Sequence, residues 1–89
     1  MDYLKDSEIF KLLGNSVRLK LLVQLMEPKN NSVHCIAEKM KLPQSTISQH
    51  LSLLKSRGLV SFNRNGSESY YFISDQRVGQ ILNLMDKGV

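Results

Sequence analysis

The sequence predicts a mostly helical domain with one β-hairpin between its fourth and fifth helices. Apolar residues recur at helical spacing over most of the chain, and the period changes to strand-like alternation over residues 59–73. With 89 residues and 42% hydrophobic side chains, the chain fits one small folded domain over residues 1–89. Local start and stop signals support each element in turn.

The N-terminal third of the chain is expected to form two helices. Residues 3–13 carry a partial apolar stripe, and Gly14 provides a stop after them. Asn15 is a good helix starter, so the second helix spans about residues 16–27. That helix is apolar on nearly all sides, which predicts a central, buried position. Pro28 and the polar residues after it end the helix.

Two further helices follow in close succession. Ser32 is placed to cap a short third helix, whose apolar residues recur at i, i+3, i+4 and i+7. Pro43 is tolerated in the first turn of the next helix, which spans about residues 44–57. Gly58 closes that helix after two basic residues that suit its C-terminal end.

The hairpin comes next and is followed by a last helix. Residues 59–64 and 68–73 are rich in β-branched and aromatic side chains, as in strands. Asn65 and Gly66 between them are a strong turn signal, because both tolerate positive φ. Residues 76–87 then carry an apolar stripe at helical spacing.

This order of elements predicts a winged helix-turn-helix. Two short helices joined by a tight turn and followed directly by a hairpin are typical of that fold. The helix-turn-helix would span about residues 33–57 and the wing about residues 59–73. In this interpretation the third helix supports the fourth, which enters the DNA major groove.

The fourth helix has an unusual outer face. Ile47, Leu51 and Leu54 form one apolar stripe, while Ser45 and Gln49 lie on the opposite side. That side carries no charged residue before Lys55, whereas solvated helix faces usually carry Glu and Lys pairs. Short neutral donors and acceptors suit close approach to base edges. The alternative is an ordinary surface rich in serine and glutamine.

The charge distribution agrees with a polyanionic partner. The net charge is +4, and residues 32–74 hold most of the surplus, with five basic and two acidic side chains. The surplus is modest, and many domains that bind no nucleic acid have as much.

Several segments together resemble the ArsR/SmtB family of bacterial repressors. They are residues 13–22, 36–40, 44–51 and 58–60 and the Tyr70-Tyr71 pair, and the resemblance covers about residues 11–85. It implies a homodimeric transcription factor, usually a repressor, that binds a pseudo-palindromic operator in double-stranded DNA.

The resemblance also implies which residues contact DNA. Gln49 is the best candidate to read a base, since its amide can pair in bidentate fashion with adenine. His50 is equally acceptable as a packing residue at the edge of the core. By their charge Lys41, Lys55 and Arg64 are candidates to contact phosphate, and each lysine is equally acceptable as a solvated charge. Arg64 and Asn65 lie near the predicted wing tip. The expected contacts are Lys41, Gln44, Ser45, Thr46, Ser48, Gln49, His50, Arg64 and Asn65.

The helices at about residues 3–13 and 76–87 are expected to form the homodimer interface. They lie outside the helix-turn-helix, and a two-fold pair of recognition helices must be held roughly 34 Å apart. The alternative is that both stripes only complete the core of one chain. The expected interface residues are Ile9, Leu12, Leu13, Val78, Ile81, Leu82 and Met85.

We predict neither a metal site nor a cofactor. Many relatives carry Cys-x-Cys before an acidic residue in the third helix, but residues 32–35 here read Ser-Val-His-Cys. The relatives' last-helix motif begins Asp-x-His, but Arg77 stands at the histidine position. Cys35 lies away from the apolar stripe, so a redox-responsive repressor remains an alternative to a passive thiol. No small-molecule effector is identifiable.

Other function classes fit the sequence poorly. No phosphate-binding loop, carboxylate pair or nucleophile motif points to an enzyme. The aliphatic runs are too short for a membrane span, and no secretory signal is evident, so a cytoplasmic location is the default. A winged-helix module that binds protein is the remaining alternative, although it would favour an exposed apolar patch on the fourth helix.

Overall fold

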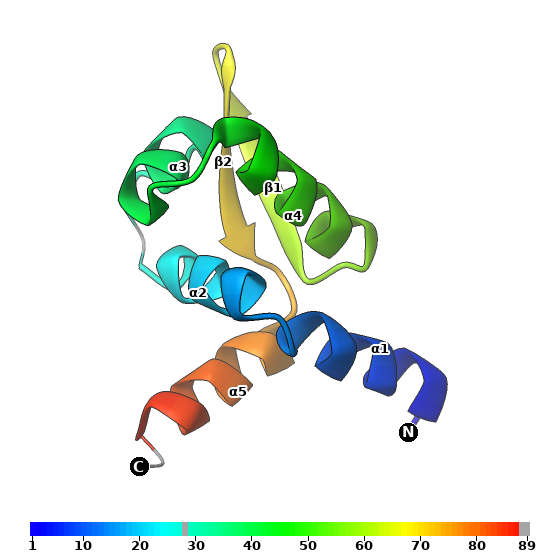
Figure 1. Ribbon diagram of the computed structural model, residues 1–89. Helices are drawn as coiled ribbons and strands as arrows, with labels where there is room; N and C mark the ends of the chain where they lie inside the picture. Colours follow the sequence, from blue (N-terminus) through cyan, green and yellow to red (C-terminus); the bar gives the residue numbers. More distant parts are fainter. Residues whose placement is uncertain (28, 88–89) are drawn as a thin grey trace.

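A computed structural model describes residues 1–27 and 29–87 and confirms the predicted winged helix-turn-helix (Figure 1). In it α1 and α5 lie at the end of the molecule opposite the hairpin tip, and α2 lies between them and the α3–α4 pair. The elements are α1 (Tyr3–Leu13), α2 (Ser16–Leu25), α3 (Val33–Met40), α4 (Gln44–Ser56), β1 (Val60–Asn65), β2 (Glu68–Ile73) and α5 (Gln76–Lys87).

The helices begin where polar side chains satisfy free backbone N–H groups. The Asn15 side chain accepts hydrogen bonds from the N–H groups of Val17 and Arg18, at 3.0 and 3.1 Å. Ser32 Oγ accepts from the Cys35 N–H at 3.2 Å and starts α3. The second helix ends at Leu25, about two residues earlier than predicted. The predicted stop at Pro28 lies outside the described residues.

The hairpin register differs by one residue from the prediction. Asn65 pairs with Glu68, so the two-residue loop is Gly66-Ser67 instead of Asn65-Gly66. Gly66 has a φ of +66°. A positive φ at the first loop position alone is the pattern of a type II′ turn, for which glycine is preferred. Asn65 is therefore the last residue of β1, and β1 spans Val60–Asn65.

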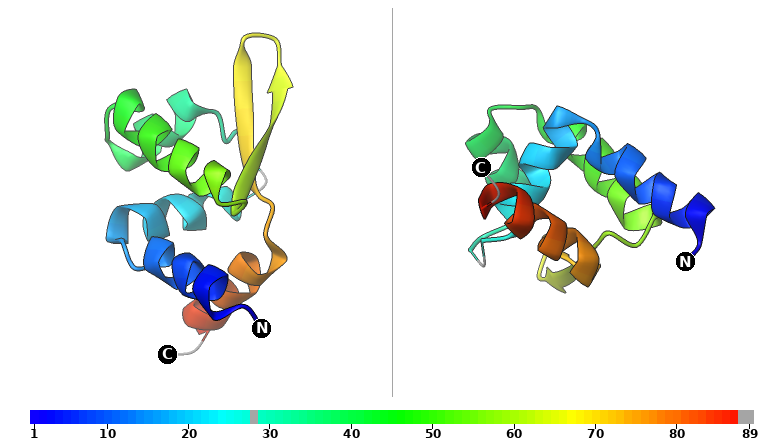
Figure 2. Two further views of the ribbon diagram at one scale, coloured as in Figure 1. Left: turned by 90° about the vertical axis from the view of Figure 1, so that its right-hand side faces the viewer. Right: turned by 90° about the horizontal axis from the view of Figure 1, so that it is seen from below.

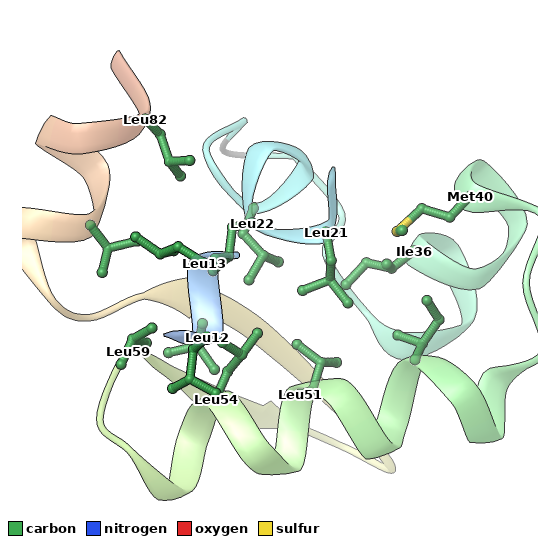
Figure 3. Close-up of a cluster of buried hydrophobic side chains, with 14 of the residues drawn as sticks. Leu12, Leu13, Leu21, Leu22, Ile36, Met40, Leu51, Leu54, Leu59 and Leu82 are labelled. Carbon is green, nitrogen blue, oxygen red and sulfur yellow. The ribbon is translucent and has the colours of Figure 1, made fainter. Parts of the chain in front are cut away.

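The core gathers the apolar stripes of all five helices and the base of the hairpin (Figure 3). On α2 the burial is less complete than predicted, because Leu19 and Val23 keep 37% and 49% of their surface exposed. The residues with no exposed surface are Leu21, Leu22, Ile36, Ile47, Leu51, Leu54, Leu59 and Val78.

The two terminal helices contribute to this same core. Leu12, Leu13, Val78 and Leu82, which were predicted to lie in a dimer interface, are all at least nine-tenths buried within the single chain. They therefore offer little surface to a partner chain. This agrees with the alternative that these parts of the stripes complete the core of one chain. Within residues 1–27 and 29–87, no helix is long and apolar enough to cross a membrane.

Candidate nucleic-acid interface

The turn between α3 and α4 sets the angle of the predicted recognition helix. Lys41 ends α3 in the left-handed conformation, with φ 57° and ψ 44°. The next N–H, of Leu42, bonds back to the Ala37 carbonyl at 3.1 Å. Pro43 precedes α4, and its carbonyl accepts from the Thr46 and Ile47 N–H groups. The two helices are thus joined by a short, hydrogen-bonded connection.

Helix α4 has the predicted two faces. The apolar stripe is fully buried, and the opposite side is exposed and uncharged up to Lys55. Of the predicted DNA contacts on this helix, Thr46 and His50 are half-buried at its edges. The others, Gln44, Ser45, Ser48 and Gln49, are exposed on one surface together with Ser52. Neutral donors and acceptors are therefore presented outward on a helix that the core holds rigidly.

A contact with His34 of α3 positions the side chain at the start of α4. Gln44 Nε2 lies 3.0 Å from Nδ1 of His34, and His34 Nε2 lies 3.3 Å from a carboxylate oxygen of Glu38. The Gln44 amide donates to the imidazole, which in turn faces the acid. Sequence reasoning weighed His34 as a metal ligand and as a base for Cys35, but not as a partner of Gln44. The i,i+4 spacing of His34 and Glu38 was the sequence signal that could have predicted the contact between these two side chains.

The basic residues around α4 divide into two groups. Lys55 Nζ lies 4.4 Å from the centre of the Phe62 ring, and Arg57 pairs with Glu8 at 3.2 Å. These two cations hold the hairpin and α1 against α4. Lys41 and Arg64 are exposed at the start of α4 and on the hairpin. The second pair is thus the better placed to meet phosphate.

The hairpin is stabilised on the side that faces α4. The Phe62 and Tyr71 rings pack with centroids 5.3 Å apart. Nearer the tip, the Tyr70 hydroxyl donates to Glu68 at 2.9 Å, and this bond to a carboxylate raises the pKa of Tyr70. Arg64 and Asn65 lie exposed on the neighbouring strand near the tip, as predicted.

Arg77 joins the two terminal helices. Its guanidinium donates to both carboxylate oxygens of Asp75 and to Asp6 of α1 at 3.1 Å. The hydrogen bond from Arg77 holds the pKa of Asp75 below its usual value, although partial burial acts in the opposite direction. Asp75 also caps α5 by accepting from the Arg77 N–H at 2.9 Å. Arg77, which stands at the histidine position of the relatives' metal motif, therefore links α1 to the start of α5 by ion pairs.

The possible metal ligands and the single thiol were the other candidates considered from the sequence. Among the described residues, no group of three or more His, Cys, Asp or Glu side chains is arranged to hold a metal ion. Cys35 is a free, half-buried thiol on α3.

The remaining predicted interface residues border an apolar surface on α1 and α5. Ile9 and Ile81 are half-buried and line a hollow of about 200 Å³ with Phe10. Met85 is 66% exposed, and its neighbour Leu84 is 71% exposed. Other exposed apolar side chains on α1 include Tyr3 and Leu4. The surface available to a partner is therefore Ile9, Ile81 and Met85 together with residues that the periodicity did not single out.

Comparison with known proteins gives consistent results at the level of sequence and fold. Residues 15–61 match the sequence profile described as bacterial regulatory protein, arsR family. An uncharacterised HTH-type transcriptional regulator of Methanocaldococcus jannaschii is 41% identical over 96% of both chains. The transcriptional repressor PagR of Bacillus anthracis is 37% identical over 91% of this chain and 81% of that protein.

Solved structures of two relatives superpose closely on this fold. The crystal structure of PagR matches with a TM-score of 0.83 and 36% identity, over 94% of this chain and 99% of that one. The second is the homodimeric winged helix-turn-helix DNA-binding domain of Mb0332 from Mycobacterium bovis, determined by NMR. It matches with a TM-score of 0.82 and 32% identity, over 92% of this chain and 75% of that one.

Proposed function

Because the chain belongs to the ArsR family of bacterial regulatory proteins, and is thus a transcriptional regulator and not an enzyme, we propose that it represses transcription as a homodimer bound to a pseudo-palindromic operator. The partner is double-stranded DNA, and the site of action is the cytoplasm. All of residues 1–89 serve this purpose as one DNA-binding domain.

The observation that carries the proposal is the exposed, uncharged face of α4, together with the exposed cations Lys41 at the start of this helix and Arg64 on the hairpin. Gln49 would read a base, while Ser45 and Ser48 would contact bases or phosphates. Gln44 and Thr46 lie in the first turn of α4, at the helix end that favours a phosphate. Lys41 and Arg64 would contact the phosphate backbone on either side of the groove.

Two further candidate DNA contacts, His50 and Asn65, lie outside the exposed face of α4. His50, half-buried at the edge of the face, would contact DNA only at its rim. Asn65 would approach the minor groove with the wing tip. Neither residue is required for the main contact of α4 with the major groove.

A homodimer follows from the need to read two half-sites. Each chain presents one recognition helix, and two-fold operators place their half-sites roughly 34 Å apart. The solved relative from Mycobacterium bovis is described as homodimeric. The exposed apolar surface on α1 and α5, far from the hairpin tip, supplies a contact that leaves both α4 helices free.

Selection from a pool of random DNA sequences, followed by footprinting of the enriched site at moderate salt, tests the proposal. We expect protection of a two-fold site over two adjacent major grooves. Uniformly weak binding that salt abolishes would contradict operator recognition, because only phosphate attraction would remain. Repeating the footprint with oxidant tests the alternative role of Cys35, since loss of protection that reductant restores would make that thiol a switch.

A further inference from the structure

A broad groove separates the hairpin from α5 on the side of the molecule away from α4. Its volume is about 920 Å³, and its walls come from the end of α2, the outer face of the hairpin and one face of α5. None of the predicted DNA contacts lines it.

The α5 wall of the groove is built from carboxamides around a glycine. Gln76, Gly79, Gln80 and Asn83 follow the spacing i, i+3, i+4 and i+7, so they share one face of the helix. Between residues 76 and 83 that face has no charged side chain. A Cβ added at Gly79 would meet no heavy atom within 4 Å, so the groove is open at its centre.

The opposite wall contains an acceptor without a donor. Asn31 is 5% exposed and lines the groove, and its Nδ2 donates to the Glu27 carbonyl at 2.9 Å. Its Oδ1 is buried and accepts no hydrogen bond from any described residue. Buried side-chain oxygens are nearly always paired, so Asn31 carries an unused acceptor in the wall of the groove, which an occupant would reach by a turn of the carboxamide toward the groove.

The hairpin wall adds aromatic surface. Phe72 is 40% exposed and lines the groove with Tyr70 and the carboxamide of Asn63. A ring that stacks on exposed aromatic surface would place its edges toward the surrounding carboxamides, which both donate and accept. The charged residues of the lining are the exposed Lys29 and Asp75, whose carboxylate is already paired with Arg77, so the lining disfavours a cationic occupant.

We propose that this groove is a binding site for a small, planar, uncharged nitrogen heterocycle that stacks against the hairpin and exchanges hydrogen bonds with the carboxamides. An occupant would touch both the wing and α5, and so would bias the angle between them. This regulatory consequence rests on the proposed function, whereas binding itself does not.

The site is compatible with a dimer formed through α1 and α5. At about 100° per residue, the carboxamide face of α5 lies about 150° around the helix from the face that carries Arg77, Ile81 and Met85. The apolar surface and the groove are therefore on nearly opposite sides of the same helix.

Gly79→Leu and Gly79→Ala provide matched variants. Leucine at this position places a branched side chain in the groove, while alanine adds only a Cβ, which meets no heavy atom within 4 Å. Both variants replace a helix-interior glycine with a better helix former. Neither variant changes a residue that contacts DNA or the apolar surface in the proposed function. Circular dichroism checks that both variants keep the fold.

The test titrates adenine and nicotinamide into the protein without DNA and follows the side-chain NH2 signals of Asn31 and Asn83 by NMR, with cyclohexanol as the non-planar probe. We expect a saturable shift with at least one planar probe, retained in Gly79→Ala and weakened at least about tenfold in Gly79→Leu. Absence of a shift with both planar probes at millimolar concentration, an equal response to cyclohexanol, or undiminished binding to Gly79→Leu would each overturn the proposal.

Discussion

At the scale of single residues, Lys41 combines backbone strain with a position beside the proposed DNA surface. Its φ of 57° is the one positive value among the described non-glycine residues. The left-handed conformation costs roughly 1–2 kcal/mol for an L residue, and glycine is the usual choice at this helix end. A strained residue that persists at a candidate site favours a functional reason for its side chain.

We therefore expect Lys41→Gly to separate stability from binding. The substitution should raise the free energy of unfolding by about 1 kcal/mol and lower the salt dependence of DNA binding by about one phosphate contact. Urea unfolding and binding isotherms at several salt concentrations measure the two effects. Lys41→Asn is the matched variant, because asparagine tolerates this conformation and also lacks the charge. An unchanged salt slope in both variants would leave Lys41 as a solvated cation.

Gln49 gives the sharpest prediction about sequence reading. Gln49→Ala should relax the preference at one base position of the operator by about 1–3 kcal/mol, if its amide makes a bidentate contact. Competition binding against operators substituted at each position measures this. Gln24→Ala, on α2, is the control and should leave the preference unchanged. If discrimination is retained at every position, Gln49 does not read a base.

Residue roles that depend on local spacing were predictable, and those that depend on tertiary neighbours were not. Helical periodicity placed Ile47, Leu51 and Leu54 in the core, and capping chemistry identified Ser32. The contact of His34 with Gln44 was missed, because it joins two helices whose relative angle the sequence pattern does not give.

At the scale of elements, we expect the wing to contact DNA phosphates without distinguishing one DNA sequence from another. Arg64 is exposed on β1, and its side chain can contact a phosphate beside the minor groove. Arg64→Ala should weaken binding to all sequences alike and lower the salt slope by about one. Lys20→Ala, on the exposed side of α2, removes an equal charge as the control. A normal slope for Arg64→Ala would mean that the wing does not reach phosphate.

The start of α5 should make stability depend on pH. The hydrogen bond from Arg77 lowers the pKa of Asp75 below its ordinary value of 3.8. A lowered folded-state pKa stabilises the protein above the unfolded value, and this contribution disappears as the pH falls through the folded value. Asp75→Asn keeps a capping side chain but removes the charge.

Urea unfolding at a fixed protein concentration, from pH 7 down to below pH 3, measures this contribution. We expect Asp75→Asn to be less stable than the unmodified protein at neutral pH, and the difference to shrink below about pH 4. A difference that stays constant with pH would mean that the Asp75 carboxylate does not contribute through its charge.

The elements themselves were predictable to within about two residues, but one pairing was not. Asn65-Gly66 satisfies the preference for residues that tolerate positive φ, and this favoured a turn there. The structure instead places Gly66-Ser67 in the loop, so Asn65 remains in β1. Both turns accept glycine, and only the pairing of the two strands distinguishes them.

At the scale of the whole molecule, the helical periodicity did not distinguish core from interface. An apolar stripe on a terminal helix looks the same whether it packs inside the chain or against a partner. Leu82 and Met85 illustrate this, since both belong to the stripe of α5 but are 3% and 66% exposed. Their substitutions should therefore act on different equilibria.

Leu82→Ala should act on folding and Met85→Glu on dimerisation. Removing the buried leucine side chain should cost about 2–5 kcal/mol of unfolding free energy. A charge at Met85 should cost about 1.5–3 kcal/mol per chain, the value of burying a methionine, and so about 3–6 kcal/mol per two-fold dimer, while leaving the fold of each chain intact. The dissociation constant would rise roughly a hundredfold or more, and operator binding would weaken with it.

Sedimentation over a range of protein concentrations, with circular dichroism on the same samples, separates the two effects. Asn30→Asp is the control, because it adds a negative charge outside the apolar surface of α1 and α5 and keeps an acceptor for the Ser32 N–H. If Met85→Glu dimerises like the unmodified protein, the exposed end of α5 lies outside the interface. The contact would then have to centre on α1, where Leu4 and Phe10 are 85% and 61% exposed. The same sedimentation assay on Phe10→Glu would then decide whether α1 alone holds the two recognition helices at operator spacing.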